Sequence, residues 1–238
     1  MRVLAVISLL FSSSLFVGCG ETTSPSGSNT GKTITMDGYG SYIEPAYYKV
    51  WSDSSWEEFG RITTIDSVVY ATIVDNTGFE YYYSSGGYAG FQVSGGSVIL
   101  FDSAMQSLPD TLVFGKTYSQ RTTFRESGTV YVMKVEQTLQ DTGAVTVPFG
   151  KFTGCLWIKS TSTFSGGGQS NVSSSEYWLA KGPSELKRRS SSGAVTLMDY
   201  GYVNGQSWGE GLPKRSTKPS LDFKIRLLPR FINPLLRR

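Results

Sequence analysis

The sequence predicts an all-β protein: a single antiparallel sheet of many strands, curved into an open half-barrel or a barrel, with little helix. Apolar and aromatic residues alternate with polar ones from Ala46 to Val203, and Gly, Asn, Asp and Ser interrupt them at short intervals, which is typical of short strands joined by tight turns. Only 17% of the 238 residues are charged, against an average share of about 25%. No window keeps a helical period over three turns, so crossover helices for a parallel sheet are not expected.

Each predicted strand is a run of period two between two turn signals. In chain order, the expected strands are residues 59–65, 67–75, 79–83, 89–93, 97–101, 116–124, 129–139, 151–163, 174–180, 185–190 and 195–203. Turns are expected at residues 76–78, 94–96, 127–128 and 192–193, because Gly and Asn accept the positive φ that hairpin turns require. Residues 51–58 are compatible with one helical turn, begun by Ser52 or Asp53.

The N-terminus has the features of a secretory signal peptide. Arg2 precedes an apolar stretch, residues 3–17, which ends at the small residues Gly18 and Cys19. Ser12, Ser13 and Ser14 interrupt this stretch, and it is shorter than the ~20 residues that a membrane-spanning helix needs. Residues 1–18 are therefore predicted to be a signal peptide.

The end of this peptide, residues 15–19 (LFVGC), resembles the lipobox of bacterial lipoproteins, although Phe16 replaces the usual Leu. The resemblance implies cleavage between Gly18 and Cys19, followed by attachment of fatty acyl chains such as palmitate to Cys19. Two or three chains, each contributing about 0.8 kcal/mol per buried methylene, would anchor the protein to a membrane. Gly20 after the cysteine resembles the signal for the outer membrane of a Gram-negative host, with a domain facing the periplasm or the cell surface. In a Gram-positive host the anchor would lie in the outer leaflet of the cytoplasmic membrane. Ordinary signal cleavage beside an incidental cysteine is the alternative.

Composition divides the rest of the chain. Residues 19–32 hold Gly, Ser, Thr, Pro and Asn and no core-forming run, so they are predicted to be a flexible tether after the lipidated Cys19. Residues 33–213 are the expected β domain. Residues 214–238 form a basic and apolar extension, which contains eight basic residues and a single acidic residue, Asp222. This extension is compatible with a membrane-surface segment, a disordered tail or a reading frame that runs past the domain.

Histidine is absent, which excludes Ser-His-Asp, Cys-His and His-metal sites. With Cys19 used as the anchor, Cys155 is the remaining cysteine, so no internal disulfide is expected. Its apolar neighbours predict a buried, structural thiol. No metal, cofactor or nucleic-acid partner is expected.

Residues 145–156 (VTVPFGKFTGCL) resemble the segment V-x-V-P-x-G-x-F-x-x-C of a group of uncharacterised bacterial secreted and lipid-anchored β proteins. Residues 177–187 are similar to its motif Y-W-x-A-P-G-V-G-x-V-K, with Lys181 and Ser184 in place of Pro and Gly, and residues 112–118 are similar to its entry strand L-x-x-G-x-x-W. The resemblance covers residues 67–200. It implies a curved sheet of the TapB-like or LolA/LolB-like kind, and it concerns the fold alone.

These motifs have a structural interpretation. Pro148 and Gly150 are expected to shape a hairpin turn, Phe152 and Leu156 to face one side of a strand, and Gly182 to supply a backbone bend.

Chemically suggestive residues are few. The carboxylates available for acid–base catalysis are Glu57, Glu58, Asp66, Asp75, Glu80, Asp102, Asp110, Glu126 and Glu136, and no spacing distinguishes any of them. Gly166, Gly167 and Gly168 are interpreted as a hairpin connection, and Asn171 as part of an incidental glycosylation sequon. Two tyrosine-rich stretches suit either cross-strand aromatic pairs or a surface that binds glycans or proteins: Tyr39, Tyr42, Tyr47 and Tyr48, then Tyr81, Tyr82, Tyr83 and Tyr88.

The favoured hypothesis is a non-enzymatic, lipid-anchored protein of the cell envelope, whose concave face binds an apolar molecule or another envelope component. The alternative is a surface module that binds glycan or protein through exposed tyrosines. A hydrolase with two carboxylates about 5–10 Å apart is a third hypothesis. The sequence leaves the ligand-binding residues, the ligand, the partner and the oligomeric state open.

Overall fold

Antiparallel strands joined by tight turns account for the fold. The structure is a computed structural model that describes residues 31–106, 108–210 and 225–227. Its strands are β1 (Thr33–Thr35), β2 (Ser41–Ile43), β3 (Tyr48–Trp51), β4 (Trp56–Ile65), β5 (Val68–Asp75), β6 (Phe79–Ser84), β7 (Gly87–Val93), β8 (Ile99–Met105), β9 (Thr111–Val113), β10 (Thr117–Glu126), β11 (Thr129–Val147), β12 (Gly150–Gly166), β13 (Gln169–Ala180), β14 (Ser184–Ser190), β15 (Val195–Val203), β16 (Gln206–Trp208) and β17 (Ile225–Leu227). Among the residues so described, no helix has the length and apolarity needed to cross a membrane.

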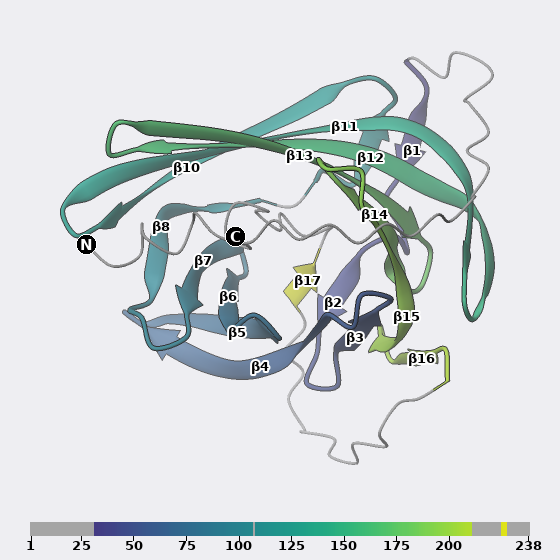
Figure 1. The fold of residues 1–238 in the computed structure, drawn as a ribbon, viewed down its shortest axis with the longest axis horizontal. Coiled ribbons are helices and arrows are strands. Elements are labelled where there is room, and N and C mark those ends of the chain that lie inside the picture. Colours follow the sequence, from purple (N-terminus) through teal and green to yellow (C-terminus); the bar gives the residue numbers. More distant parts are fainter. Residues whose placement is uncertain (1–30, 107, 211–224, 228–238) are drawn as a thin grey trace.

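The main sheet has 13 strands. Its order is β10-β11-β12-β13-β14-β15-β3-β4-β5-β6-β7-β8, with β16 paired to β15, and all of these pairs are antiparallel. In Figure 1 the long strands β10–β13 form the upper wall, β14 and β15 descend on one side, β3–β7 lie below, and β8 rises on the opposite side toward β10. The predicted curved antiparallel sheet is confirmed.

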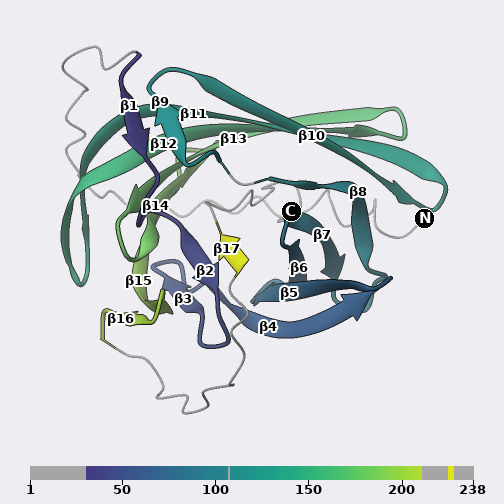
Figure 2. The same cartoon turned by 180° about the vertical axis from the view of Figure 1, so that it is seen from behind.

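The two ends of this sheet meet. Strand β8 contacts β10, and Thr122 Oγ1 on β10 donates a hydrogen bond of 2.7 Å to the carbonyl oxygen of Ser103 on β8. Beside it, the Thr123 hydroxyl donates to the carboxylate of Asp102. Side-chain hydrogen bonds therefore close the sheet into a nearly complete barrel, and we call this junction the seam. Figure 2 shows the same barrel from behind.

Two small sheets complete the structure: β1 pairs with β9, and β2 pairs with β17. Strand β2 contacts β5, and β17 contacts β7, and both views draw β2 and β17 within the curve of the main sheet (Figures 1 and 2).

Turn chemistry explains why the predicted strands form. Between β10 and β11, Glu126 pairs with Thr129, and the two residues between them, Ser127 and Gly128, have φ of 49° and 81°. Positive φ at both positions is the geometry of a type I′ hairpin turn, which matches the twist of the flanking strands. Each predicted strand is present, and most extend a few residues beyond the predicted bounds.

Three sequence-based expectations are wrong. Residues 51–58 form no helical turn, because Asp53 Oδ1 accepts a hydrogen bond from Ser55 N (3.0 Å) and the chain turns directly into β4. Residues 112–118 are not one entry strand, since a turn at Gly115 separates β9 from β10. Phe152 and Leu156 pack in different apolar clusters, because register shifts in the β11–β12 pair interrupt the alternation between them.

The remaining motif expectations hold. Pro148 lies in the turn between β11 and β12, and Gly182 lies in the turn between β13 and β14 with φ of 91°. Gly167 and Gly168 form the β12–β13 hairpin connection, and Gly166 is the last residue of β12 and pairs with Gln169.

Candidate binding site inside the barrel

The inner wall carries a continuous group of aromatic rings, which we call the inner aromatic cluster. Its members are Phe79, Tyr81, Tyr83, Tyr88, Phe91, Phe101, Phe124, Tyr131 and Phe164. The rings meet across the seam: the ring centres of Phe91 and Phe124 are 5.8 Å apart, and those of Phe101 and Phe124 are 5.7 Å apart. The cluster continues along the upper wall, where Tyr131 and Phe164 are 5.2 Å apart. The barrel thus has an apolar, polarisable lining where β5–β8 face β10–β12.

Further along the upper wall the lining becomes polar. Ser160, Ser162, Ser173 and Gln137 are all buried, and register places them in adjacent rows: Val135 pairs with Ser162 and Ser162 with Ser173, while Gln137 pairs with Ser160. We call these four residues the polar belt. Beyond them, Leu139, Ile158 and Tyr177 form an apolar row that packs against Leu112 and Met36.

One hydrogen bond ties the belt to the next row: Gln137 Nε2 donates to the Tyr177 hydroxyl over 2.7 Å. Burial raises the pKa of Tyr177 above its usual value, so this hydroxyl stays protonated at every physiological pH.

A second group of polar residues with little exposure, the inner charge cluster, consists of Lys49, Glu57, Glu185 and Arg188 near Trp51. Lys49 Nζ donates to the Glu185 carbonyl oxygen over 3.1 Å. The Arg188 Cζ atom lies 3.7 Å from the centre of the Trp51 ring, and Arg188 Nε lies 3.9 Å from Glu185 Oε1. Lys49 pairs with Glu57 across β3 and β4. Lys49, Glu57 and Glu185 are buried, and the Arg188 side chain is 14% exposed. Two positive and two negative side chains thus lie together, which limits the cost of removing each from water.

The strand order explains how these charges meet. Strand β15 separates β14 from β3, and on it Gly201 pairs with Lys49. A Cβ atom at position 201 would lie 2.5 Å from the Tyr48 carbonyl oxygen and 2.7 Å from Met198 Cε. Glycine at this position therefore permits the close packing across which Lys49 reaches β14.

Two of the carboxylates considered for catalysis are neighbours inside the barrel: Glu57 and Asp75 pair across β4 and β5, and both are buried. Asp75 Oδ1 accepts hydrogen bonds from the backbone amides of Thr77 (2.9 Å) and Phe79 (3.2 Å), and Tyr81 donates to its Oδ2 atom over 2.9 Å. The Tyr47 hydroxyl donates to Glu57. Asp75 thus fixes the β5–β6 turn, a structural role.

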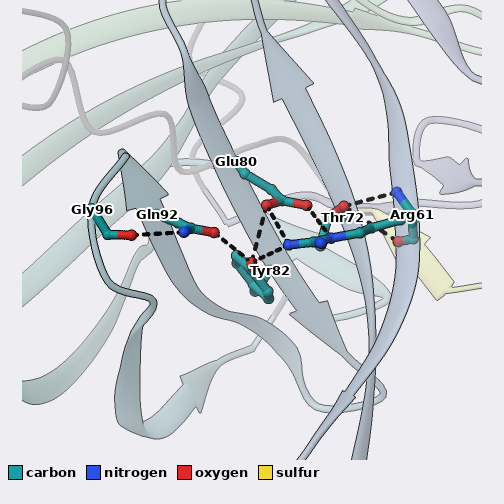
Figure 3. Close-up of polar contacts among 6 residues, drawn as sticks. All are labelled: Arg61, Thr72, Glu80, Tyr82, Gln92 and Gly96. Atoms are coloured by element: carbon teal, nitrogen blue, oxygen red, sulfur yellow. Dashed lines mark hydrogen bonds and ion pairs between the residues drawn. The ribbon is translucent and has the colours of Figure 1, made fainter. Parts of the chain in front are cut away.

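The other carboxylates are dispersed. Glu80 lies on the outer face, where Arg61 Nε donates to its Oε1 atom over 2.9 Å and Arg61 Nη2 donates to its Oε2 atom over 3.0 Å. Figure 3 shows this pair with the Tyr82 hydroxyl, which lies 3.0 Å from Glu80 Oε2 and 2.9 Å from Gln92 Oε1. Asp102 is used at the seam. Within the described residues, no group of three or more acidic or cysteine side chains is arranged to hold a metal ion.

The tyrosines expected as a possible binding surface are mostly buried, which contradicts that alternative for these residues. Tyr39, Tyr47, Tyr81, Tyr82, Tyr83 and Tyr88 are each at most 6% exposed. Tyr83 and Tyr88 pair across β6 and β7 with ring centres 5.4 Å apart, so the expected cross-strand aromatic pairing is confirmed.

Cys155 is buried, as predicted. Burial raises the pKa of its thiol, which disfavours the reactive thiolate. Gly18, Cys19 and most of the 214–238 extension lie outside the described residues, and of that extension only β17 is described.

Sequence reasoning missed Lys49, Trp51 and Arg188. Strand β3 is four residues long and was not predicted, so the inward alternation of Lys49 and Trp51 was not evident. Arg188 belongs to a predicted strand, in which it stands between Lys187 and Arg189. Because all three residues are basic, the alternation of residue types does not indicate which side chain points inward.

Two pockets in the described part of the chain are lined by residues outside the inner charge cluster and the polar belt. One, of about 530 Å³, is lined by Asp37, Gly38, Gly40, Asp110, Gly182, Asn204 and Gln206. The other, of about 290 Å³, lies at the β5–β6 and β7–β8 turns and includes Gly78, Glu80, Gln92 and Gly95. Both are lined largely by glycine and polar residues, unlike typical sites for apolar ligands.

No protein-family model matches this sequence, and no curated protein matches it. Among solved structures, a candidate lipoprotein from Parabacteroides distasonis is similar with a TM-score of 0.33 and 9% identity, over 66% of this chain and 97% of that protein. A candidate exported protein with a YmcC-like fold from Bacteroides fragilis gives a TM-score of 0.28 and 7% identity, over the same shares of the two chains. At these values neither similarity assigns this chain to a family or to a function.

Proposed function

We propose that this protein is a non-enzymatic lipoprotein of the cell envelope, anchored through acylated Cys19, and that the interior of its barrel binds an apolar molecule. The path of the main sheet, from β10 to β8, runs through 12 strands. A barrel of about eight strands is just wide enough for its own side chains to fill, and larger barrels enclose room for a ligand. The number of strands in this barrel is the observation that carries the proposal.

The lining supports the same conclusion. Ligand sites are mainly apolar and aromatic, with a few placed polar groups, and the inner wall combines the inner aromatic cluster with the polar belt. The alternative of a tyrosine-based surface module loses support, because the tyrosines that it requires are buried.

The anchor is tested by replacing each cysteine in turn. In cells supplied with an alkyne-labelled fatty acid, we expect the full-length protein to incorporate label and to sediment with membranes. Cys19→Ser should abolish labelling, whereas Cys155→Ser, which removes the other cysteine, should not. Equal labelling of wild type and Cys19→Ser would contradict the anchor.

Ligand binding is tested by native mass spectrometry of the full-length protein purified from its own host, followed by solvent extraction. We expect a lipid-sized mass that is released by extraction and that differs from the covalent acyl chains. A protein that carries only its acyl chains, and that binds no long-chain compound when one is added, would contradict the proposal.

A further inference from the structure

Strand β17 takes up space that the main sheet encloses. Its three residues pair with those of β2 in antiparallel register: Ile225 with Ile43, Arg226 with Tyr42 and Leu227 with Ser41. It also contacts β7, and both views draw it within the curve of the main sheet (Figures 1 and 2). A strand from beyond the main sheet in sequence therefore lies in the region where the proposed ligand would bind.

The neighbours of β17 belong to the apolar lining. Strand β2 contacts β5, and its residue Ile43 is 1% exposed and part of the same apolar core as the inner aromatic cluster. Strand β7 supplies Tyr88 and Phe91 to that cluster. Because β17 touches both β2 and β7, an apolar ligand and β17 cannot fill this part of the interior at the same time.

The pairing that holds β17 is short. It joins three residues on each strand in a sheet of two strands, whereas β10 and β11 of the main sheet pair over ten residues. An isolated pair of strands is marginally stable in water. Residues 209–224 separate β17 from β16 in the sequence, so β17 can leave β2 without breaking any pairing of the main sheet.

We infer that β17 is a removable strand within the barrel, which pairs with β2 when the interior holds no ligand and leaves when an apolar ligand binds. The inference rests on the proposed binding function and adds its regulation. Because the ligand binds the open form alone, its apparent affinity is lowered in proportion to the fraction that is open. If β17 is paired roughly nine-tenths of the time, opening it permanently should tighten binding about 10-fold.

A reversible crosslink tests this inference in the full-length protein. Ser41→Cys together with Leu227→Cys introduces two thiols at directly opposite positions of β2 and β17. Opposite residues of antiparallel strands have Cα atoms about 4.5–5.5 Å apart, which lies within the range of about 4.4–6.8 Å that a disulfide requires. Diamide closes the crosslink and dithiothreitol opens it. The closed form should bind the apolar fluorophore N-phenyl-1-naphthylamine at least about 10-fold more weakly than the same protein after reduction.

The matched control is Thr33→Cys together with Val113→Cys, because these residues lie opposite each other in the β1–β9 sheet. Closing this crosslink should leave fluorophore binding unchanged.

A second variant, Ile225→Pro together with Arg226→Pro, opens the pairing without a crosslink. Backbone amides of adjacent strand residues point to opposite sides, so one of the two prolines removes a donor to β2. This variant should bind the fluorophore about 10-fold more tightly than wild type.

Equal binding by the closed and reduced forms of the Ser41→Cys, Leu227→Cys protein would overturn the inference and leave apolar binding intact. A similar loss on closing the control crosslink, or weaker binding by the proline variant than by wild type, would overturn it too. Failure of the β2–β17 crosslink to form would contradict the pairing itself. If no form of the protein binds the fluorophore, the proposed function fails together with the inference.

Discussion

The guanidinium of Arg188 lies over the indole ring of Trp51, with Cζ 3.7 Å from the ring centre. The two residues come from β14 and β3, which are separated by β15, so their contact joins three strands of the main sheet. Cation–π contacts are strongest when water is excluded, and the Arg188 side chain is only 14% exposed. This contact is therefore expected to stabilise the fold.

Arg188→Met should destabilise the protein by about 3 kcal/mol, because it removes the cation from Trp51 and breaks the Arg188–Glu185 ion pair in a region that water scarcely reaches. Arg121→Met, at an exposed position on β10, is the matched control and should change stability by less than about 0.5 kcal/mol. Urea unfolding measures both. Similar losses for the two variants would contradict a role for the contact.

Gly201→Ala should cost about 2 kcal/mol, since the added methyl would overlap the Tyr48 carbonyl oxygen and Met198 and force the strands apart. At Gly143 a Cβ atom would meet nothing within 4 Å, so Gly143→Ala serves as the control and should be nearly neutral. Thermal unfolding compares the two, and an unchanged midpoint for Gly201→Ala would show that the packing between β15 and β3 is looser than described.

Thr122→Val should weaken the seam, because valine has the shape of threonine but cannot donate to Ser103. We expect a loss of about 1 kcal/mol and faster amide hydrogen exchange confined to β8 and β10. Thr64→Val on the exposed side of β4 controls for the substitution itself. If exchange in β8 and β10 stays at the wild-type rate, the two sheet ends are held together by other contacts.

Cys155 should resist thiol reagents in the folded protein at pH of about 8 and react rapidly once urea unfolds it. Burial raises the pKa of the Cys155 thiol in the folded protein, so this thiol loses its proton at a lower pH in the unfolded chain than in the folded one. The contribution of Cys155 to the stability of the fold is therefore complete below the unfolded pKa of about 8.5. It decreases as the pH rises above that value. Val172→Cys introduces a thiol at a position that is 65% exposed and should react at once. If Cys155 in the native protein reacts as fast as the thiol introduced by Val172→Cys, its burial is contradicted.

The strands and turns of this protein could be predicted because they depend on neighbours in the chain. Alternation of apolar residues sets which side of a strand is buried, and a pair such as Ser127 and Gly128 is enough to specify a tight hairpin. The short strand β3 was not predicted because four residues carry too little periodicity, and the expected strand at residues 112–118 is divided by the turn at Gly115 into β9 and the start of β10. The Phe152–Leu156 expectation was wrong because register shifts between paired strands leave no clear mark in the sequence.

The sequence by itself determined the all-β class, the antiparallel order of the hairpins and the burial of Cys155, and it predicts export and an anchor at Cys19. Only the tertiary structure decided that β8 closes on β10, that Lys49 and Trp51 meet Glu185 and Arg188, and that β17 pairs with β2. The physical reason is distance along the chain: local alternation and turn residues encode each hairpin, whereas the seam, the inner charge cluster and the polar belt arise from the curvature and register of the whole sheet, to which every strand contributes.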